Sequence, residues 1–324
     1  MNSYRIPNTT LEVSRIAYGC MQLGGPWDRS PYGPAETARA AKLLATAVEQ
    51  GVTLFDHADI YAMGKSEAVF GEALRQSPGL RERIVIQSKC GIRFRDDPTP
   101  GDPGRYDFSY EHIVRSVEGS LRRLQTDYLD ILLLHRPDPL VEPEEVARAF
   151  DELQREGKVR YFGVSNHTPG QMALLQKHLD QPLIANQVEI SLLHAHLIHE
   201  GIIANQEGYA YTAAAGTLDY CRLHGILVQA WGPVAGGRLF NPPAGAEPRV
   251  YETASLIGRL AAEKGTSREA IALAWLLRHP AGIQPIVGTT RPERLAASCL
   301  ADDVTLSREE WYGLFVAARG AGVP

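Results

Sequence analysis

The stretch Leu129-Asp-Ile-Leu-Leu-Leu-His135 shows the fold class most clearly, because it is an almost unbroken apolar run that ends in a histidine. Such runs are typical of parallel strands covered on both faces, whereas a strand with one wet face alternates apolar and polar residues. Comparable short runs recur along the chain. We expect strands at residues 16–23, 53–58, 84–90, 129–135, 161–165, 183–190, 226–231 and 285–288.

Helical patterns separate these runs. Residues 37–50 place apolar side chains on one face and stop at Gly51, and further helices are expected at 110–124, 142–156 and 169–178. The alternation of eight strands with helices predicts an α/β fold, a closed (β/α)8 TIM barrel that spans residues 1–324 as one domain.

A doubly wound sheet is the alternative fold. It normally carries a Gly-x-Gly-x-x-Gly loop after its first strand, but the sequence there is Gly19-Cys-Met-Gln-Leu-Gly-Gly25. Two stretches without apolar periodicity, residues 93–106 and 205–216, are expected to be loop insertions. The first follows the third strand, on the face where barrels carry their chemistry.

The bulk composition argues against several classes of protein. The 324 residues carry a net charge of −5, so no excess of positive charge points to nucleic acid. No apolar tract reaches the roughly 18 residues of a membrane span, and the first residues lack the apolar core of a secretory signal. The four cysteines are widely scattered, which is typical of reduced thiols in a cytoplasmic protein.

Polar residues follow several of the expected strands. Asp56 ends the second strand, Lys89 the third and His135 the fourth, while Tyr61 follows Asp56 by five residues. Polar residues at the carboxyl ends of barrel strands are candidates for catalysis. A lysine near a dry interior needs a partner, which Asp56 could supply. An ammonium beside a phenol lowers the tyrosine pKa, so we expect Lys89 to tune Tyr61 as a general acid.

Each of these residues also has an ordinary structural explanation. Asp56 could cap a helix, Tyr61 could pack as an aromatic, Lys89 could pair with a surface acid, and His135 could be a satisfied strand-end histidine. One such coincidence is common in a barrel of this size. Four of them at neighbouring strand ends favour a functional cluster.

A metal site is the competing interpretation. His194-Ala-His196-Leu-Ile-His199 offers histidines of the kind that bind zinc in hydrolases. Such a site needs a further carboxylate or histidine from later strands, and Ile286-Val-Gly-Thr-Thr290 offers neither. We therefore expect no metal and take these histidines to lie on a polar helix or loop face.

Several segments resemble, in the same order along the chain, the motifs of the aldo-keto reductases. The catalytic motifs correspond to Phe55-Asp-His-Ala-Asp-Ile-Tyr61, Gln87-Ser-Lys-Cys90 and Leu132-Leu-Leu-His-Arg-Pro-Asp138. The cofactor motifs correspond to Gly163-Val-Ser-Asn166, Asn186-Gln-Val-Glu189, Ala230-Trp-Gly-Pro233, Gly236-Gly-Arg-Leu239 and Pro285-Ile-Val-Gly-Thr-Thr-Arg-Pro-Glu-Arg294. The resemblance covers roughly residues 5 to 318 and looks closest to a bacterial, largely uncharacterised branch.

This resemblance implies a barrel whose base is plugged by a hairpin at residues 4–14. It implies that Tyr61 is the general acid, that Lys89 tunes it, that Asp56 pairs with Lys89, and that His135 orients the substrate carbonyl. It also implies a monomer or weak homo-oligomer, no metal, and NADPH bound in an extended form across the carboxyl face of the barrel.

The same resemblance assigns cofactor-binding roles. Ser165, Asn166 and Gln187 would hold the nicotinamide carboxamide, and Trp231 would stack on the ring, where the family more often has Tyr. The full set is Met21, Asp56, Ser165, Asn166, Gln187, Trp231, Gly232, Pro233, Gly237, Arg238, Gly288, Thr289, Thr290 and Arg294.

The choice between NADPH and NADH depends on the end of the last strand. Many family members have Lys where Gly288 stands and Asn or a similar residue where Ser298 stands. Arg294 remains here, Arg291 is close in sequence, and a guanidinium fork suits a phosphate dianion. We therefore expect NADPH to be preferred.

The predicted activity is reversible reduction of an aldehyde or ketone. The alternative is a nucleotide-binding regulatory protein with little turnover, as the potassium-channel β subunits of the resembled family largely are. Substrate contacts are expected from His135, Trp27 and Ile92, and the pocket walls from Met63, Phe94, Tyr209 and Tyr211 as well. These side chains suggest an apolar carbonyl compound.

Overall fold

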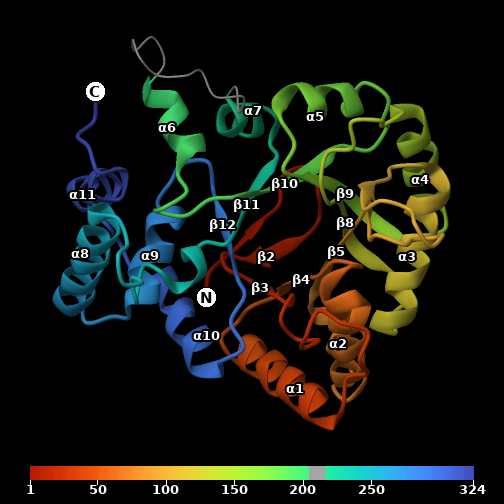
Figure 1. Cartoon of the computed structure of the whole chain (residues 1–324), viewed down its shortest axis with the longest axis horizontal. Coiled ribbons are helices and arrows are strands. Elements are labelled where there is room, and N and C mark those ends of the chain that lie inside the picture. Colours follow the sequence, from red (N-terminus) through yellow and green to blue (C-terminus); the bar gives the residue numbers. More distant parts are fainter. Residues whose placement is uncertain (204–215) are drawn as a thin grey trace.

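In the computed structural model, which describes residues 1–203 and 216–324, parallel strands close into a barrel with helices around it (Figure 1). The strands lie around the barrel in the order β3, β4, β5, β8, β9, β10, β11, β12 and back to β3. Their bounds are β3 Ala17–Gly19, β4 Leu54–Asp56, β5 Val85–Cys90, β8 Leu129–Leu134, β9 Val159–Ser165, β10 Leu183–Glu189, β11 Leu227–Trp231 and β12 Gln284–Val287. The expected TIM barrel is confirmed.

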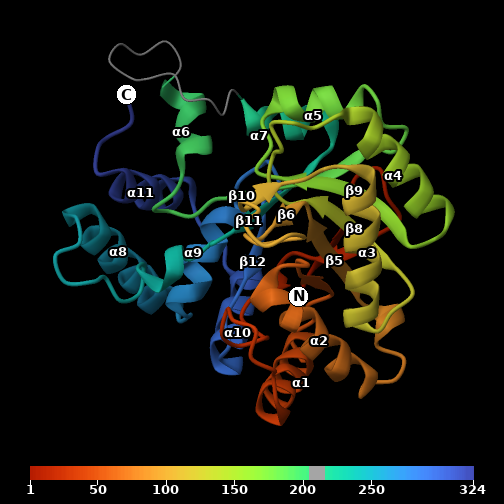
Figure 2. The ribbon, with the colours of Figure 1, turned by 45° about the vertical axis from the view of Figure 1, so that its right-hand side comes forward.

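Helices follow the strands and pack on the outside of the barrel. They are α1 Pro34–Glu49, α2 Lys65–Arg75, α3 Tyr110–Leu124, α4 Pro143–Arg155, α5 Pro169–Gln176, α6 His196–Ile203, α7 Thr217–His224, α8 Pro248–Lys264, α9 Arg268–Leu277, α10 Pro292–Cys299 and α11 Arg308–Arg319. Figure 2 shows α3 and α4 running beside β8 and β9. Their local sequences explain their starts: Ser109 caps α3 with its hydroxyl, and Thr168 forms a capping box with Gln171 at α5.

The base of the barrel is closed by the amino-terminal hairpin. Strands β1 (Ser3–Arg5) and β2 (Glu12–Ser14) pair antiparallel, as expected. Ile6 and Val13 of this hairpin are fully buried against side chains that point into the barrel, among them Leu54, Ile131 and Leu133. The apolar plug leaves the carboxyl ends of the strands as the open face of the barrel.

Two sequence-based expectations need correction. The first strand ends at Gly19, before the expected residue 23, because Cys20 begins a turn in which the Leu23 amide donates to the Cys20 carbonyl. The stretch at 93–106 contains part of a small hairpin, β6 (Ile92–Arg93) with β7 (Arg105–Tyr106). Most of the insertion expected at 205–216, with Tyr209 and Tyr211, lies outside the described residues.

The remaining expectations concern the cysteines and the membrane. All four cysteines are free and buried, and burial raises the pKa of the Cys20 and Cys90 thiols. Across the two described segments, every helix is too short or too polar to cross a bilayer.

The packing of α2 on α3 yields a stability prediction. A methyl group on Gly71 would lie 2.5 Å from the Arg123 carbonyl oxygen and 2.7 Å from the Leu124 carbonyl carbon, which are backbone atoms that cannot move aside cheaply. Gly71→Ala should therefore lower the free energy of unfolding by about 1–3 kcal/mol, as overpacking does elsewhere. Urea denaturation measures the change.

The matched control is Gly170→Ala in α5, where an added methyl group meets nothing within 4 Å. This variant should be neutral or more stable by up to about 1 kcal/mol, because alanine favours the helix. Equal effects at both positions would contradict the close α2–α3 contact.

Candidate active site

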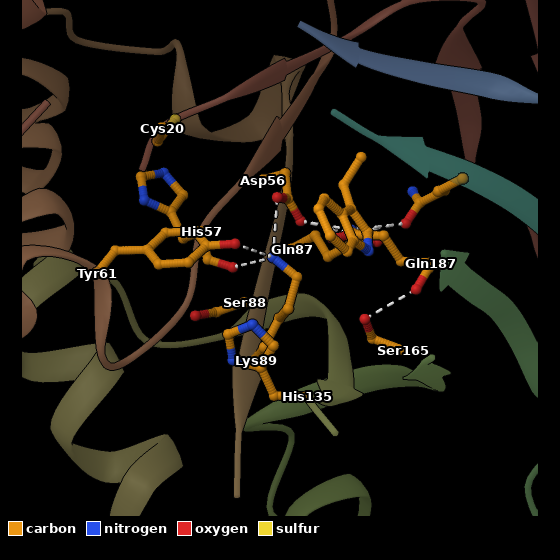
Figure 3. Close-up of polar contacts among 12 residues, drawn as sticks. Cys20, Asp56, His57, Tyr61, Gln87, Ser88, Lys89, His135, Ser165 and Gln187 are labelled. Carbon is orange, nitrogen blue, oxygen red and sulfur yellow. Dashed lines mark hydrogen bonds and ion pairs between the residues drawn. The ribbon is translucent and has the colours of Figure 1, made fainter. Parts of the chain in front are cut away.

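Polar side chains from successive strands meet at the open face of the barrel (Figure 3). Asp56 ends β4, Lys89 lies near the end of β5, His135 follows β8, and Ser165 ends β9. Asp56, His135 and Ser165 line a cavity of about 520 Å³, which we call the catalytic cavity, and the buried Lys89 contacts Asp56 and Tyr61 in its wall. Its walls include Met21, Trp27, Asp56, Tyr61, Ile92, His135, Ser165, Asn166, Gln187, Trp231, Gly232, Pro233 and Gly288, all of them expected site residues.

The centre of the cluster is a buried ion pair. The Nζ of Lys89 lies 2.8 Å from Oδ2 of Asp56, and both side chains are almost completely buried. The same Nζ donates to the His57 carbonyl oxygen at 2.8 Å and to the Tyr61 hydroxyl at 3.0 Å. All three donor positions of the ammonium are therefore directed to fixed partners, and the phenol is one of them.

An unusual backbone conformation follows Tyr61 directly. Ala62, Met63 and Gly64 all have positive φ, at 49°, 61° and 86°. Two adjacent non-glycine residues in this region cost energy and are found where a surrounding structure holds them, often at functional sites. The bend brings the Tyr61 ring edge-on to His135, with 5.8 Å between ring centroids, and close to Trp27 at 6.2 Å.

The pKa of Tyr61 differs from the sequence-based expectation. Burial raises the pKa of Tyr61 above its ordinary value, and the nearby Lys89 offsets only part of that rise. For Lys89, burial lowers the pKa, but Asp56 and Tyr61 raise it more, so the net direction is upward. The expected net lowering of the Tyr61 pKa is therefore wrong. At neutral pH the structure presents a protonated phenol beside an ammonium.

His135 is neutral in this setting. Burial, Lys89 and Arg136 together hold the pKa of its imidazole well below the ordinary value. Its Nδ1 is buried and has no hydrogen-bond partner among the described residues, while the backbone amide of His135 donates to the Cys90 carbonyl. A neutral imidazole at the cavity wall can donate a hydrogen bond to a substrate oxygen without adding charge.

Sequence reasoning identified Gln187 as a site residue but missed the glutamine network that it forms beneath the cluster. Gln87 and Gln187 both donate to Oδ1 of Asp56, at 2.6 and 2.9 Å, and both also donate to Oε1 of Gln229. Gln229 in turn donates to Gln284 at 3.0 Å. Gln87, Gln187 and Gln229 lie two residues before Lys89, Glu189 and Trp231 on their respective strands. Because alternate residues of a strand point to the same face, this period of two was the sequence signal that could have revealed the network.

The three residues expected to hold a nicotinamide are linked to one another. Ser165 donates to the Gln187 carbonyl at 2.8 Å, and Asn166 donates to the Ser165 hydroxyl at 2.8 Å. The Trp231 indole donates to Oδ1 of Asn166 at 3.1 Å, which orients the ring at the cavity wall. Asn166 itself has φ of 61°, a conformation that asparagine tolerates better than most residues.

A second cavity continues from the first and holds the expected phosphate ligands. Its volume is about 320 Å³, and it shares Gln22, Val234, Gly236 and Gly288 with the catalytic cavity. Its further walls include Gly237, Thr289, Thr290, Arg291 and Arg294. Arg238 lines neither cavity and instead donates to the Ala235 carbonyl. The two cavities therefore adjoin, and we call them together the groove.

Some expected residues lie elsewhere. Met63 and Phe94 line a separate cavity, which meets the catalytic cavity at Ile60 and Ile92. His194 and His196 lie between β10 and the first turn of α6, with ring centroids 4.5 Å apart. Within residues 1–203 and 216–324, no group of three or more His, Cys, Asp or Glu side chains is placed to hold a metal ion.

A half-buried carboxyl group, that of Asp59, lies two residues before Tyr61. The Asp59 amide donates to the Lys89 carbonyl at 3.0 Å, while Oδ1 of its side chain is buried and has no hydrogen-bond partner in the described part of the chain. Burial and the nearby Glu67 raise the pKa of Asp59 to about 8, against a smaller lowering by Arg123. Asp59 is therefore mostly protonated below that pH.

Comparisons with known proteins place this geometry among reductases. The model of the Aldo/keto reductase family matches residues 15–314. The uncharacterized oxidoreductase YcsN of Bacillus subtilis is 39% identical over 316 residues, which is 97% of each chain. The 6-dehydroglucose reductase of Agrobacterium fabrum is 38% identical over 314 residues, also 97% of each chain.

A solved structure shows the same likeness. The crystal structure of an aldo/keto reductase from Klebsiella pneumoniae, in complex with NADP and acetate, is 29% identical with a TM-score of 0.71. The match covers 94% of this chain and 90% of that one.

The raised pKa of Asp59 predicts how stability changes with pH. Between about pH 4 and 8 the folded carboxyl holds a proton that the unfolded one has lost, so the free energy of unfolding should fall as pH rises. Asp59→Asn removes this titration. The stability of the variant relative to wild type should rise from pH 5 to 8, by up to about 1.4 kcal/mol per pH unit.

Urea unfolding at pH 5, 6, 7 and 8 measures this difference. Asp28→Asn is the control, because the pKa of the exposed Asp28 is lowered to about 2 and both states are ionised throughout the range. Parallel stability curves for wild type and Asp59→Asn would show that Asp59 does not titrate as argued.

Proposed function

This chain belongs to the aldo/keto reductase family and is an oxidoreductase, and we propose that it reduces aldehydes or ketones to alcohols with NADPH, with Tyr61 as the general acid. The observation that carries the proposal is the contact of the Tyr61 hydroxyl with Lys89 at 3.0 Å, while Asp56 holds that lysine at 2.8 Å. The phenol, the ammonium group beside it and the carboxylate that pairs with this ammonium are thus joined in one chain of contacts.

The cluster can deliver a proton to a developing alkoxide. The protonated Tyr61 hydroxyl is the donor, and the Lys89 ammonium stabilises the phenolate that remains. Asp56 keeps the lysine charged and in place, and neutral His135 donates a hydrogen bond to the substrate oxygen. A positioned general acid contributes about 10²–10⁴-fold to the rate.

The chemistry of the residues that line the groove fits a dinucleotide. When bound, NADPH supplies the hydride for the carbonyl carbon. The catalytic cavity offers an aromatic face at Trp231 and amide groups at Asn166 and Gln187. Asn166 already hydrogen-bonds to Ser165, Trp231 and the His135 carbonyl, so contact with a carboxamide requires that one of these bonds be exchanged. Gly232, whose φ of 62° is a conformation that glycine adopts without strain, and Pro233 also line this cavity.

The second cavity supports NADPH over NADH. Arg291 and Arg294 line it, and in the described part of the chain neither forms an ion pair with a carboxylate. Glu269 also lines this cavity and opposes an anion there. Two unpaired guanidinium groups outweigh one carboxylate, so the 2′-phosphate is the group that this end of the groove favours. Gly288 provides no charge at the position where many members have Lys.

The central prediction concerns Tyr61. Tyr61→Phe should lower kcat for reduction by NADPH about 10²–10⁴-fold, because the proton donor is lost while the ring is kept. Its Kd for NADPH should stay within a factor of three or so of wild type. Stopped-flow or steady-state assays with a panel of aldehydes and ketones measure the first, and quenching of tryptophan fluorescence measures the second.

Lys89→Met should be comparably slow, since the ammonium that lowers the pKa of Tyr61 is then lost. Retained turnover in Tyr61→Phe would rule out its role as acid. A wild-type protein that binds NADPH but reduces none of the panel would instead be a nucleotide-binding regulator.

A separate prediction concerns cofactor choice. Wild type should bind NADPH more tightly than NADH, and Arg294→Ala should weaken NADPH binding about tenfold or more, because hydrogen bonds to charged groups contribute about 1.5–3 kcal/mol. NADH binding should hardly change. Equal Kd values for the two cofactors in the wild-type protein would remove the stated preference.

A further inference from the structure

The segment that joins β3 to α1 contributes one wall of the catalytic cavity. Residues 20–33 form turns and bends, and Met21, Gln22 and Trp27 of this segment line the cavity. The Trp27 ring lies edge-on to the Tyr61 ring, with 6.2 Å between centroids, yet Trp27 is 46% exposed. A ring with so much open surface is held by few neighbours, so its position depends on how the backbone on either side is attached.

On the amino-terminal side of Trp27, the segment is attached to the start of α2. The fully buried Ser66 donates its hydroxyl to the Met21 carbonyl at 2.9 Å and accepts from the Gly24 amide at 3.2 Å. A side-chain carbon on Gly24 would lie 2.6 Å from the Ser66 amide nitrogen, so the approach requires glycine. This attachment fixes the part of the segment that lies beside the proposed cofactor site.

On the carboxyl-terminal side of Trp27, a lysine makes the second attachment. The Nζ of Lys65 donates to Oδ1 of Asp28 and to the Ser30 carbonyl oxygen, both at 3.0 Å. The same Asp28 oxygen accepts from the Ser30 amide at 3.0 Å and from the Ser30 hydroxyl. An ion pair between fully exposed groups contributes little, but the Lys65 side chain is only 11% exposed and has two acceptors. We call the contact of Lys65 with Asp28 and Ser30 the Lys65 anchor.

Both attachments are made by the residues that begin α2, directly after the catalytic loop. Lys65 and Ser66 follow Tyr61 through the turn at residues 62–64, all three of which have positive φ. The support of the Tyr61 ring and the support of the Trp27 ring are therefore the same short piece of chain. Loss of the Lys65 anchor alone would move Trp27 relative to Tyr61, because Ser66 would still fix the other side of the segment.

Trp27 and Asp28 line different cavities. Trp27 lines the catalytic cavity, whereas Asp28 and Lys65 line the separate cavity of Met63 and Phe94, whose volume is about 970 Å³. The backbone between Trp27 and Asp28 therefore lies between the two cavities. The Lys65 anchor fixes this dividing wall from the side of the larger cavity.

We propose that Lys65 is a positioning residue whose anchor holds Trp27 beside Tyr61 and keeps the catalytic cavity narrow, and this rests on the proposed carbonyl reduction. Lys65 itself does not line the catalytic cavity, so it acts through Trp27. Without the anchor, a small aldehyde loses the aromatic wall that binds it, while a longer aldehyde gains space toward the larger cavity. The catalytic contacts of Tyr61 with Lys89 are untouched. The anchor therefore governs substrate binding and size selection, and hardly affects the chemical step.

The experiment removes the ammonium and compares a small with a longer aldehyde at saturating NADPH. In Lys65→Met, the KM for benzaldehyde should rise about 5- to 20-fold while kcat stays within about twofold, because hydrogen bonds to a charged group are lost outside the catalytic cluster. The KM for para-phenylbenzaldehyde should stay the same or fall. The Kd for NADPH should stay within about twofold, since the Ser66 attachment remains. Lys65→Arg keeps a charged donor and should restore most of the preference for benzaldehyde.

A second variant separates positioning from a general loss of stability. Trp27→Ala should itself raise the KM for benzaldehyde, and Lys65→Met added to it should raise the KM by less than about twofold more, because two changes that act through one ring are not additive. Lys158→Met is the matched control. The Nζ of Lys158 also lies 3.0 Å from a carboxylate, that of Glu118, but this pair lies at the amino-terminal end of β9, away from the open face. The control should leave both KM values unchanged.

Fluorine NMR of protein labelled with fluorotryptophan gives a readout that needs no turnover. The Trp27 resonance is assigned by its loss in Trp27→Phe, and it should shift or broaden in Lys65→Met but not in Lys158→Met. An unchanged Trp27 resonance in Lys65→Met would overturn the proposal, as would a rise in KM that persists in full in the Trp27→Ala background. If the wild type turns over and Lys65→Met has the same KM values, the positioning role alone fails. If the wild type reduces neither aldehyde, the proposed function fails.

Discussion

The active face depends on one buried ion pair, Lys89 with Asp56. Two charges taken out of water are costly unless their geometry is close and their remaining hydrogen-bonding positions are filled. Here the ammonium has Asp56, the His57 carbonyl and the Tyr61 hydroxyl, and the second oxygen of Asp56 receives Gln87 and Gln187. Removal of either partner would leave an unpaired charge inside the barrel. The neighbouring side chains are therefore held in positions that keep the pair intact.

The barrel explains why these residues meet. Parallel strands deliver their carboxyl ends to one face, and the apolar hairpin closes the other end. The glutamine network of Gln87, Gln187, Gln229 and Gln284 forms a polar layer between the apolar plug and the charged cluster. In that layer the side-chain amide nitrogens donate to neighbouring oxygens, whereas Oε1 of Gln87 is buried and has no hydrogen-bond partner among the described residues.

Sequence patterns predict the strands and the Lys89–Asp56 ion pair better than they predict the pKa of Tyr61. Continuous apolar runs such as that before His135 mark buried parallel strands, and a lysine after one of them needs a nearby acid. The pKa of Tyr61 depends on how much water its hydroxyl loses, which is set by the fold around it and not by its neighbours in sequence. The Gln87–Gln229 contact joins residues 142 positions apart and depends on strand register across the barrel. The β6–β7 hairpin forms in a stretch without apolar periodicity, because Arg93 pairs there with Asp97 and Asp107.

The most direct test of the central claim is the pH dependence of the hydride-transfer step, measured in single turnovers of the NADPH-bound enzyme with a reducible aldehyde. If Tyr61 is the acid, held protonated by burial beside a charged Lys89, the rate should be flat through neutral pH and fall only at strongly alkaline pH. A rate that instead falls with an apparent pKa near 6–7, the ordinary range of histidine, and loses that dependence in His135→Gln would contradict the account.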